Sequence, residues 1–162
     1  MAAGLGTRLR SSTPKVLHPL CGRPVLAYVI DAAVAATGAK PLVVISPPVA
    51  LIADVFAGEA DFAIQAEPRG TADAIATALR DLPPDVAEII VLSGDVPLVD
   101  AALMAELAQA RRDTASAVAL ISVDMDDPAT LGRVDRGPDG RITGVVEYKD
   151  ATAEQLAITE IN

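Results

Sequence analysis

The segment EIIVLSGDVPL, residues 88–98, gives the clearest indication of the fold class. Its first six residues, 88–93, contain the aliphatic run Ile89–Leu92, which is typical of a strand buried on both faces of a parallel sheet. The turn at Gly94 and Asp95 follows directly. Since ligands bind in open α/β sheets at the carboxyl ends of the strands, Asp95 is expected to point into a binding crevice.

Outward from this stretch, apolar patterns typical of strands and of helices alternate along the chain. The predicted helices cover residues 24–38, 50–57, 71–80 and 100–112, and the predicted strands cover residues 41–46, 61–65, 88–93 and 115–123, with two shorter strands within residues 133–148. Pro24 suits the start of the first helix, Gly38 its end, and Asp100 the N-cap of the last helix. The alternation predicts one α/β domain, Rossmann-like and doubly wound, with a mostly parallel sheet.

Composition excludes several classes of function. The chain has 162 residues, a net charge of −9, two Phe, two Tyr and no Trp. A nucleic-acid surface needs clustered cations and stacking rings, so none is expected. No apolar run reaches the roughly 18 residues of a membrane span, and no signal peptide is visible. Cys21 is the single cysteine, which excludes an intramolecular disulfide and fits a cytoplasmic protein.

Positive charge gathers at the front of this acidic chain. Gly4 and Gly6 allow a tight turn whose N–H groups can face a phosphate, and Arg8 and Lys15 add mobile positive charge. Phosphate binding is the physical interpretation, although glycine-rich turns are common without it. His18 has no Ser or Cys nucleophile as a partner, so a structural role is expected for it.

Asp95 is the candidate metal ligand. Mg²⁺ prefers one or two carboxylates together with substrate phosphates, and a carboxylate at the crevice satisfies this preference. The alternative is that Asp95 only caps a turn before Pro97. The residues by themselves leave both interpretations open.

Three motifs resemble one enzyme family. AAGLGTRL (2–9) followed by TPKVLHPLCGRPVL (13–26), QAEPRGT (65–71) and LSGDVPL (92–98) are similar to the bacterial bifunctional N-acetylglucosamine-1-phosphate uridylyltransferases, within the wider nucleotidyltransferase superfamily. The last third of the chain is similar to them as well, in GRV (132–134), VEYKDAT (146–152) and EIN (160–162). The wider superfamily shares only the GxGTR and PK elements.

The resemblance implies roles for particular residues. The expected catalytic residues are Arg8 and Lys15, and the expected ligand of the Mg²⁺ cofactor is Asp95. The expected nucleotide-binding residues are Ala2, Ala3, Gly4, Gly6, Thr7, Gln65, Gly70 and Thr71, and the expected sugar-binding residues are Gly132, Glu147 and Asn162. Pro68, Asp73, Thr130 and Leu131 depart from the family, which often has Gln, His, Gly and Tyr there.

The resemblance also implies a reaction. A phosphate oxygen of N-acetylglucosamine-1-phosphate attacks the α-phosphorus of UTP, which gives UDP-N-acetylglucosamine for cell-wall synthesis and releases pyrophosphate. Residues 1–162 of this chain are expected to form a partial uridylyltransferase domain that is truncated at both ends. The first strand of the domain is expected to be missing. The family's acetyltransferase β-helix domain, through which it forms homotrimers, is expected to be absent. Marginal folding and no activity are expected for this fragment.

Two alternatives stay open. Another sugar-phosphate nucleotidyltransferase would form a dTDP, CDP or GDP product, and competition between UTP and the other triphosphates would separate the two. A catalytically silent nucleotide-binding module is the alternative from a different class. The presence of Arg8, Lys15 and Asp95 argues against a silent module.

Overall fold

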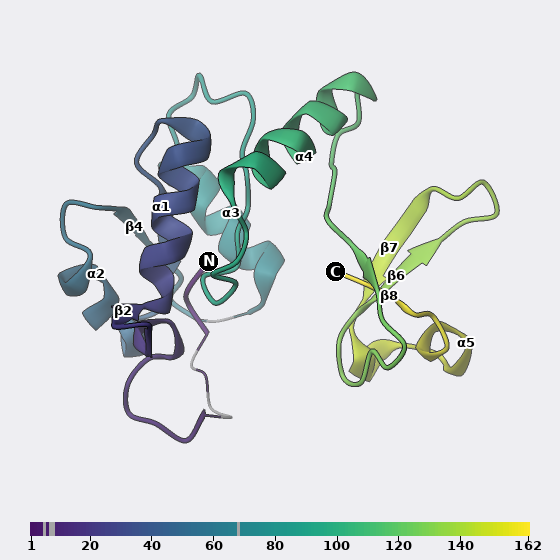
Figure 1. Ribbon diagram of the computed structural model, residues 1–162, viewed down its shortest axis with the longest axis horizontal. Helices are drawn as coiled ribbons and strands as arrows, with labels where there is room; N and C mark the ends of the chain where they lie inside the picture. Colours follow the sequence, from purple (N-terminus) through teal and green to yellow (C-terminus); the bar gives the residue numbers. More distant parts are fainter. Residues whose placement is uncertain (5, 7–8, 68) are drawn as a thin grey trace. The chain divides into compact units, whose positions relative to one another are not determined.

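A computed structural model describes residues 1–4, 6, 9–67 and 69–162 of the chain. The chain forms two compact units. The first unit is Met1–Glu106 and the second is Leu107–Asn162, with the boundary inside helix α4 (Ala101–Asp113). Figure 1 shows the elements of each unit. The expectation of one nucleotidyltransferase domain over residues 1–162 stays a prediction.

The first unit contains most of the helices. Its elements before α4 are η2 (Lys15–Leu17), β1 (Pro19–Leu20), β2 (Arg23–Pro24), α1 (Val25–Thr37), β3 (Leu42–Ile45), η3 (Pro47–Val49), α2 (Leu51–Val55), β4 (Asp61–Ile64) and α3 (Thr71–Asp81), where η marks a 3-10 helix. All four predicted helices are present. Gly38 ends α1 in the left-handed conformation, with φ of 66°. The Asp100 carboxylate accepts from the backbone N–H of Leu103 at 2.9 Å, so this residue caps α4 as predicted.

Parallel pairing organises the sheet of the first unit. Strands β3 and β4 are parallel, with Leu42 opposite Asp61 and Ile45 opposite Ile64. Residues 1–3 lie along the other edge of β3, where the Ala2 N–H donates to the Val44 carbonyl at 2.8 Å. The expected phosphate turn is therefore preceded by extended backbone that takes part in the sheet.

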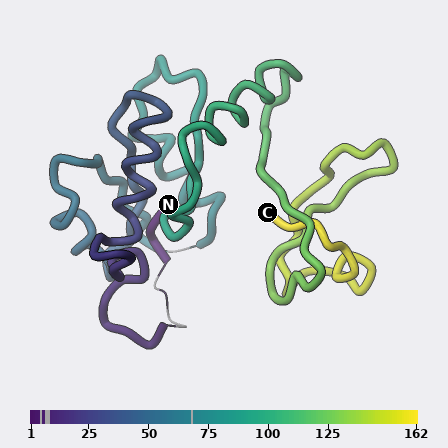
Figure 2. The backbone as a smooth tube through the Cα atoms, viewed as in Figure 1, coloured from purple at the N-terminus to yellow at the C-terminus, as the bar shows by residue number. Residues whose placement is uncertain are grey.

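The segment of residues 88–93 does not form the predicted strand. Among the described residues, its backbone pairs at its end: the Met1 nitrogen donates to the Leu92 carbonyl at 2.6 Å, and the Gly94 N–H donates to the Met1 carbonyl at 2.8 Å. Figure 2 traces this segment past the N-terminus. Ile89 is 41% exposed and Val91 is 43% exposed. An aliphatic run forms a strand only where a neighbouring strand satisfies its backbone, and here the hydrogen bonds stop after a single parallel step.

Helices cover both faces of the β3–β4 pair. Val43 and Ile45 belong to a core cluster with Leu26 and Ile30 of α1, while Val44, between them in sequence, packs in a separate cluster with α3. Successive side chains of a strand point to opposite faces, so this alternation places α1 and α3 on opposite sides of the sheet. The layering matches the predicted doubly wound arrangement.

The second unit is built on a hairpin. Its elements after α4 are β5 (Val123–Asp124), β6 (Arg133–Arg136), β7 (Ile142–Val146), η4 (Tyr148–Asp150), α5 (Ala153–Leu156) and β8 (Glu160–Ile161). Strands β6 and β7 are antiparallel around the predicted turn at residues 137–140, and β5 pairs with β8. The Thr152 hydroxyl and the Gln155 side chain form a capping box at α5.

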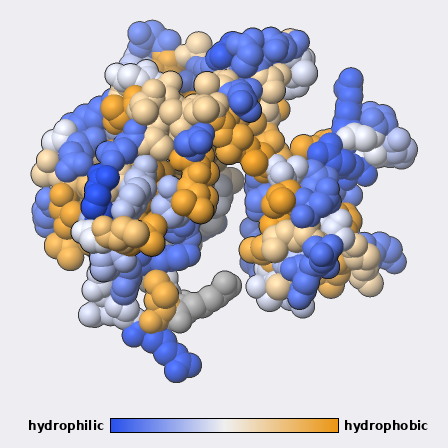
Figure 3. Space-filling model, viewed as in Figure 1, coloured by the Kyte–Doolittle hydropathy of each residue, from blue (hydrophilic) through white to orange (hydrophobic). Residues whose placement is uncertain are grey.

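The predicted strand at residues 115–123 is wrong for all but its last residue. Val123 belongs to β5, whereas Val118 is 76% exposed and lies outside every strand. A buried strand needs neighbours on its edges and faces, and β5 finds only the two residues of β8. Figure 3 shows apolar areas beside hydrophilic ones on the surface. Among the described residues, no helix is long and apolar enough to cross a membrane.

Candidate functional site

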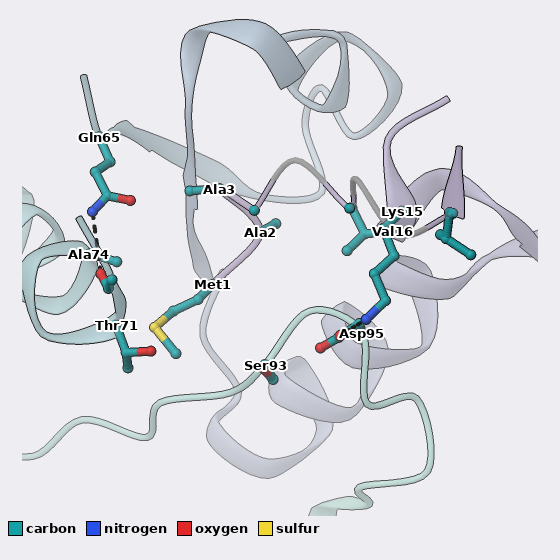
Figure 4. A pocket seen from close by; sticks show the side chains of 14 residues that line it. Met1, Ala2, Ala3, Lys15, Val16, Gln65, Thr71, Ala74, Ser93 and Asp95 are labelled. Carbon is teal, nitrogen blue, oxygen red and sulfur yellow. Dashed lines mark hydrogen bonds and ion pairs between the residues drawn. The ribbon is translucent and has the colours of Figure 1, made fainter. Parts of the chain in front are cut away.

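A cavity of about 640 Å³ opens in the first unit where the expected nucleotide residues meet. Figure 4 shows side chains from the N-terminal segment, the end of β4, the start of α3 and the 93–95 turn around it. The lining residues are Met1, Ala2, Ala3, Gly4, Gly6, Leu9, Lys15, Val16, Gln65, Gly70, Thr71, Ala74, Ser93 and Asp95. Its size is within the range of small-molecule sites. Segments far apart in the sequence thus form one concave site.

The N-terminal glycine turn lines this cavity with backbone. Ala2 is 5% exposed and Ala3 is 7% exposed, and the buried Ser46 hydroxyl donates to the Ala3 carbonyl at 2.8 Å. Gly6 has φ of 60°, and a Cβ added there would lie 2.8 Å from the Lys15 Cβ. Close approach of Lys15 therefore requires glycine at position 6. Thr7 and Arg8 lie outside the described residues.

Lys15 and Asp95 form an ion pair in the cavity. Their side chains are 47% and 32% exposed, and the Lys15 ammonium donates directly to a carboxylate oxygen of Asp95. Burial by itself would raise the pKa of Asp95, but the hydrogen bond and charge of Lys15, with smaller help from Ser93, leave this pKa below its ordinary value. Asp95 is consequently ionised at neutral pH and suited to a cation.

Gln65 directly follows β4, and its side-chain amide is hydrogen-bonded from one side. The residue is 3% exposed, and its Nε2 donates to an Asp73 carboxylate oxygen at 2.6 Å and to the Gly70 carbonyl at 3.4 Å. Gly70 has φ of 105°, a conformation that favours glycine, at the entry to α3. The end of the strand, the turn and the helix N-terminus thus bring Gln65, Gly70 and Thr71 to one side of the cavity.

The fit of a divalent cation rests on Asp95. Among the described residues, no group of three or more His, Cys, Asp or Glu side chains is arranged to hold a metal ion. Mg²⁺ accepts sites with one or two carboxylates when substrate phosphates and water complete its shell. The ionised Asp95 in an open cavity fits this kind of site.

The expected sugar residues belong to the second unit. Arg133 is opposite Val146 in the β6–β7 ladder, so Gly132 and Glu147 flank the same end of the hairpin. A Cβ added at Gly132 would lie 3.3 Å from the Val146 carbonyl oxygen. Asn162 follows β8, and its Nδ2 donates to the Ile121 carbonyl at 3.0 Å. The structure brings Gly132 and Glu147 together and ties Asn162 to the residues before β5.

Three residues that were not among the predicted site residues contribute to these surroundings. Ser93 lines the cavity beside Asp95, and Asp73 holds Gln65. Arg133 is 3% exposed and donates through its guanidinium to the carbonyls of Leu131 and Ala129, the latter at 3.3 Å. The available signal for Asp73 was an acidic residue in the first turn of the helix that follows the Gln65 turn, whereas the burial of Arg133 has no signal in the sequence.

Comparison with known proteins assigns the family. Residues 1–137 match the MobA-like NTP transferase domain, and the chain belongs to this family of nucleotidyltransferases. The bifunctional protein GlmU of Sorangium cellulosum is 41% identical over 170 residues, covering 100% of this chain and 36% of the relative. GlmU of Pelotomaculum thermopropionicum is 44% identical over 163 residues, covering 100% and 35%. The chain therefore spans about a third of the length of these relatives and corresponds to an N-terminal GlmU-like part.

Solved structures confirm the predicted fold class. The UDP-glucose pyrophosphorylase of Acinetobacter baumanii matches with a TM-score of 0.67 at 19% identity, covering 99% of this chain and 69% of that one. HddC of Yersinia pseudotuberculosis, solved in complex with GMP-PN, matches with a TM-score of 0.59 at 25% identity, covering 90% and 66%. The fold is the α/β fold of the nucleotide-diphospho-sugar transferases.

Proposed function

We propose that this chain carries the nucleotide site, and part of the sugar site, of a sugar-1-phosphate uridylyltransferase. The reaction joins UTP and N-acetylglucosamine-1-phosphate into UDP-N-acetylglucosamine and pyrophosphate. The carrying observation is the cavity that collects the glycine turn, Lys15, Asp95 and the Gln65 turn in one place. Identity of 41% to 44% to GlmU proteins over the whole chain supports the choice of this reaction within the family.

Different residues of the cavity contact different parts of the nucleotide. Backbone N–H groups of the turn containing Gly4 and Gly6 face the triphosphate, and Lys15 neutralises its charge. Gln65 and the N-terminus of α3 at Thr71 receive the base. Positioning and charge neutralisation are sufficient chemistry, because the attacking oxygen belongs to the sugar phosphate and no covalent enzyme intermediate is needed.

Asp95 is the residue that would hold Mg²⁺. A bound Mg²⁺ would supply positive charge that offsets the negative charge of the substrate phosphates. Lys15 must then exchange its contact with Asp95 for one with phosphate. The exchange costs little, because a half-exposed ion pair contributes about 0 to 1 kcal/mol.

The hairpin of the second unit would supply sugar contacts. The Glu147 carboxylate can accept from sugar hydroxyls, and the backbone of Gly132 can approach a ligand closely because it lacks a Cβ. Asn162 offers an amide for an acetamido or hydroxyl group. The homotrimer and the acetyltransferase domain of the longer protein stay predictions.

A guanine nucleotide is the specific alternative to UTP. HddC, at 25% identity, was solved with GMP-PN, and an amide oxygen such as that of Gln65 accepts from guanine as well as from uracil. Titration with UTP, GTP, CTP and dTTP separates these outcomes. UTP is expected to bind most tightly.

Calorimetric titration of the chain with UTP and Mg²⁺ tests the proposal. Binding is expected to depend on Mg²⁺ and to weaken at least about tenfold in Asp95→Ala, because a phosphate-bound metal loses its protein ligand. Lys15→Ala is expected to weaken binding at every Mg²⁺ concentration.

Matched controls remove equal charge outside the cavity. Asp85 is an exposed loop residue, and Lys40 forms an exposed ion pair with Asp61 at 2.9 Å. Asp85→Ala and Lys40→Ala are expected to leave UTP affinity within about twofold. A folded chain that binds no triphosphate, or an Asp95→Ala variant with unchanged Mg²⁺ dependence, contradicts the proposed function.

A further inference from the structure

The Gln65 amide has a fixed orientation in the cavity. The side-chain oxygen of Asp73 and the backbone carbonyl of Gly70 both accept from Gln65 Nε2, so the end of the amide that faces them is the NH₂ group. Both hydrogens of that group are then engaged. Figure 4 shows the oxygen at the other end, turned away from α3 and toward the cavity.

The free oxygen is the feature that bears on function. Gln65 is 3% exposed, and within the described part of the chain its Oε1 receives no hydrogen bond. A ligand that enters the cavity therefore meets an acceptor at this point and not a donor. Reversing the amide would place its oxygen 2.6 Å from a carboxylate oxygen, which is strongly unfavourable.

We propose that Asp73 is a positioning residue that locks Gln65 as an acceptor, and thereby selects nucleobases with a central N–H donor on their Watson–Crick edge. Uracil and thymine offer N3–H there, and guanine offers N1–H. Cytosine and adenine carry an unprotonated acceptor nitrogen at the same place, which would face Oε1 with no hydrogen between them. The inference rests on the proposed nucleotide site and adds the origin of its base selection.

Substitution of Asp73 by Asn breaks the lock with little change of shape. The Asn amide can accept from Gln65 or donate to it, so either orientation of the Gln65 amide becomes possible. Asp73→Glu keeps an obligate acceptor and is the variant expected to rescue selection. Asp81→Asn, an exposed acid at the end of the same helix, is the control for lost charge.

The experiment measures the ratio of UTP to CTP affinity by calorimetric titration of the folded chain and these variants. UTP is expected to bind the unmodified chain about tenfold more tightly than CTP, since a buried acceptor facing an acceptor loses a hydrogen bond. In Asp73→Asn the ratio is expected to fall to about threefold or less, mainly through tighter CTP binding. Asp73→Glu and Asp81→Asn are expected to retain the ratio. A change in packing alone would weaken both nucleotides together.

Two results overturn the inference while the proposed function stands: equal affinity for UTP and CTP in the unmodified chain, or an unchanged ratio in Asp73→Asn. Binding of neither nucleotide by the folded chain overturns the proposed function instead. The lock itself is then judged without ligand, from the side-chain amide resonances of Gln65 in a ¹H–¹⁵N spectrum. Asp73→Ala is expected to shift the Gln65 amide resonances, whereas Asp81→Ala is expected to leave them unchanged. Unchanged resonances in Asp73→Ala would show that Asp73 does not hold the Gln65 amide.

Discussion

The two units of this chain are stabilised by different means. In the first, aliphatic side chains are fully enclosed, with Ile52 at 0% and Ile45 at 2% exposed. In the second, the most enclosed side chains include Val134 at 1% and the cationic Arg133 at 3%. The first unit depends on apolar burial, whereas the second depends heavily on hydrogen bonds and ion pairs. Each therefore responds to a different perturbation.

The largest effect is expected from emptying the apolar core of the first unit. Ile52→Ala removes a fully buried side chain and is expected to lower the free energy of unfolding by about 2 to 5 kcal/mol. Leu51→Ala, at a neighbouring side chain that is 55% exposed, is the matched control and should cost well under half as much. Urea unfolding with amide hydrogen exchange reports the loss for each unit. Equal losses of unfolding free energy in both variants would show that apolar burial does not dominate the stability of the first unit.

A somewhat smaller loss is expected from Arg133→Ala in the second unit. The change removes the donors to the carbonyls of Leu131 and Ala129 and is expected to cost about 2 to 3 kcal/mol. The loss should appear in exchange of the β6–β7 amides and leave the β3–β4 amides unchanged. Arg141→Ala, whose side chain is 88% exposed, serves as the control. No change in β6–β7 exchange would show that the buried guanidinium contributes nothing.

Acid is expected to act on the second unit through Glu160. Its side chain accepts from Arg136 at 2.6 Å and from the Ser122 hydroxyl at 2.5 Å, which lowers the pKa of Glu160 from 4.5 to about 2. A lowered pKa stabilises the folded state above pH 4.5, and the contribution is lost as pH falls toward 2. Exchange of the β5–β8 amides between pH 5 and 2 measures it. Glu160→Gln should flatten this dependence, and a profile identical to that of the unmodified chain would contradict the assignment.

The smallest effect on stability is expected at the functional ion pair. Lys15→Met is expected to change the free energy of unfolding by less than about 1 kcal/mol, because the pair with Asp95 is half exposed. Thermal unfolding measures this change, and UTP titration of the same variant measures function. A large loss of stability would mean that the pair supports the fold of the first unit as well as its site.

The local sequence pattern predicted an element correctly where the element's own residues are sufficient to form it. The helix after Pro24 and the hairpin around residues 137–140 were confirmed because proline, glycine and turn residues act on their own backbone. The strands at 88–93 and 115–123 were wrong because an aliphatic run does not specify its hydrogen-bonding neighbours. Only the end of the first run pairs, with Met1, and only Val123 of the second joins a strand.

The candidate site divides in the same way. Motifs predicted Lys15, Gln65 and Asp95 as site residues, and all three line the cavity, while their roles toward phosphate, base and metal stay predictions. Sequence gave no means to pair Lys15 with Asp95, which are 80 residues apart, or to recognise that Asp73 holds Gln65. Contacts of this kind depend on how strands and helices pack.

Local motifs and short-range backbone preferences were sufficient to predict the family, the α/β class and the residue types available for nucleotide chemistry. Tertiary structure alone decided that residues 1–3 enter the sheet, that Arg133 is buried, and that the Gln65 amide turns its oxygen toward the cavity. The physical reason is that burial and hydrogen-bond direction are set by neighbours distant in the chain, which no local pattern encodes.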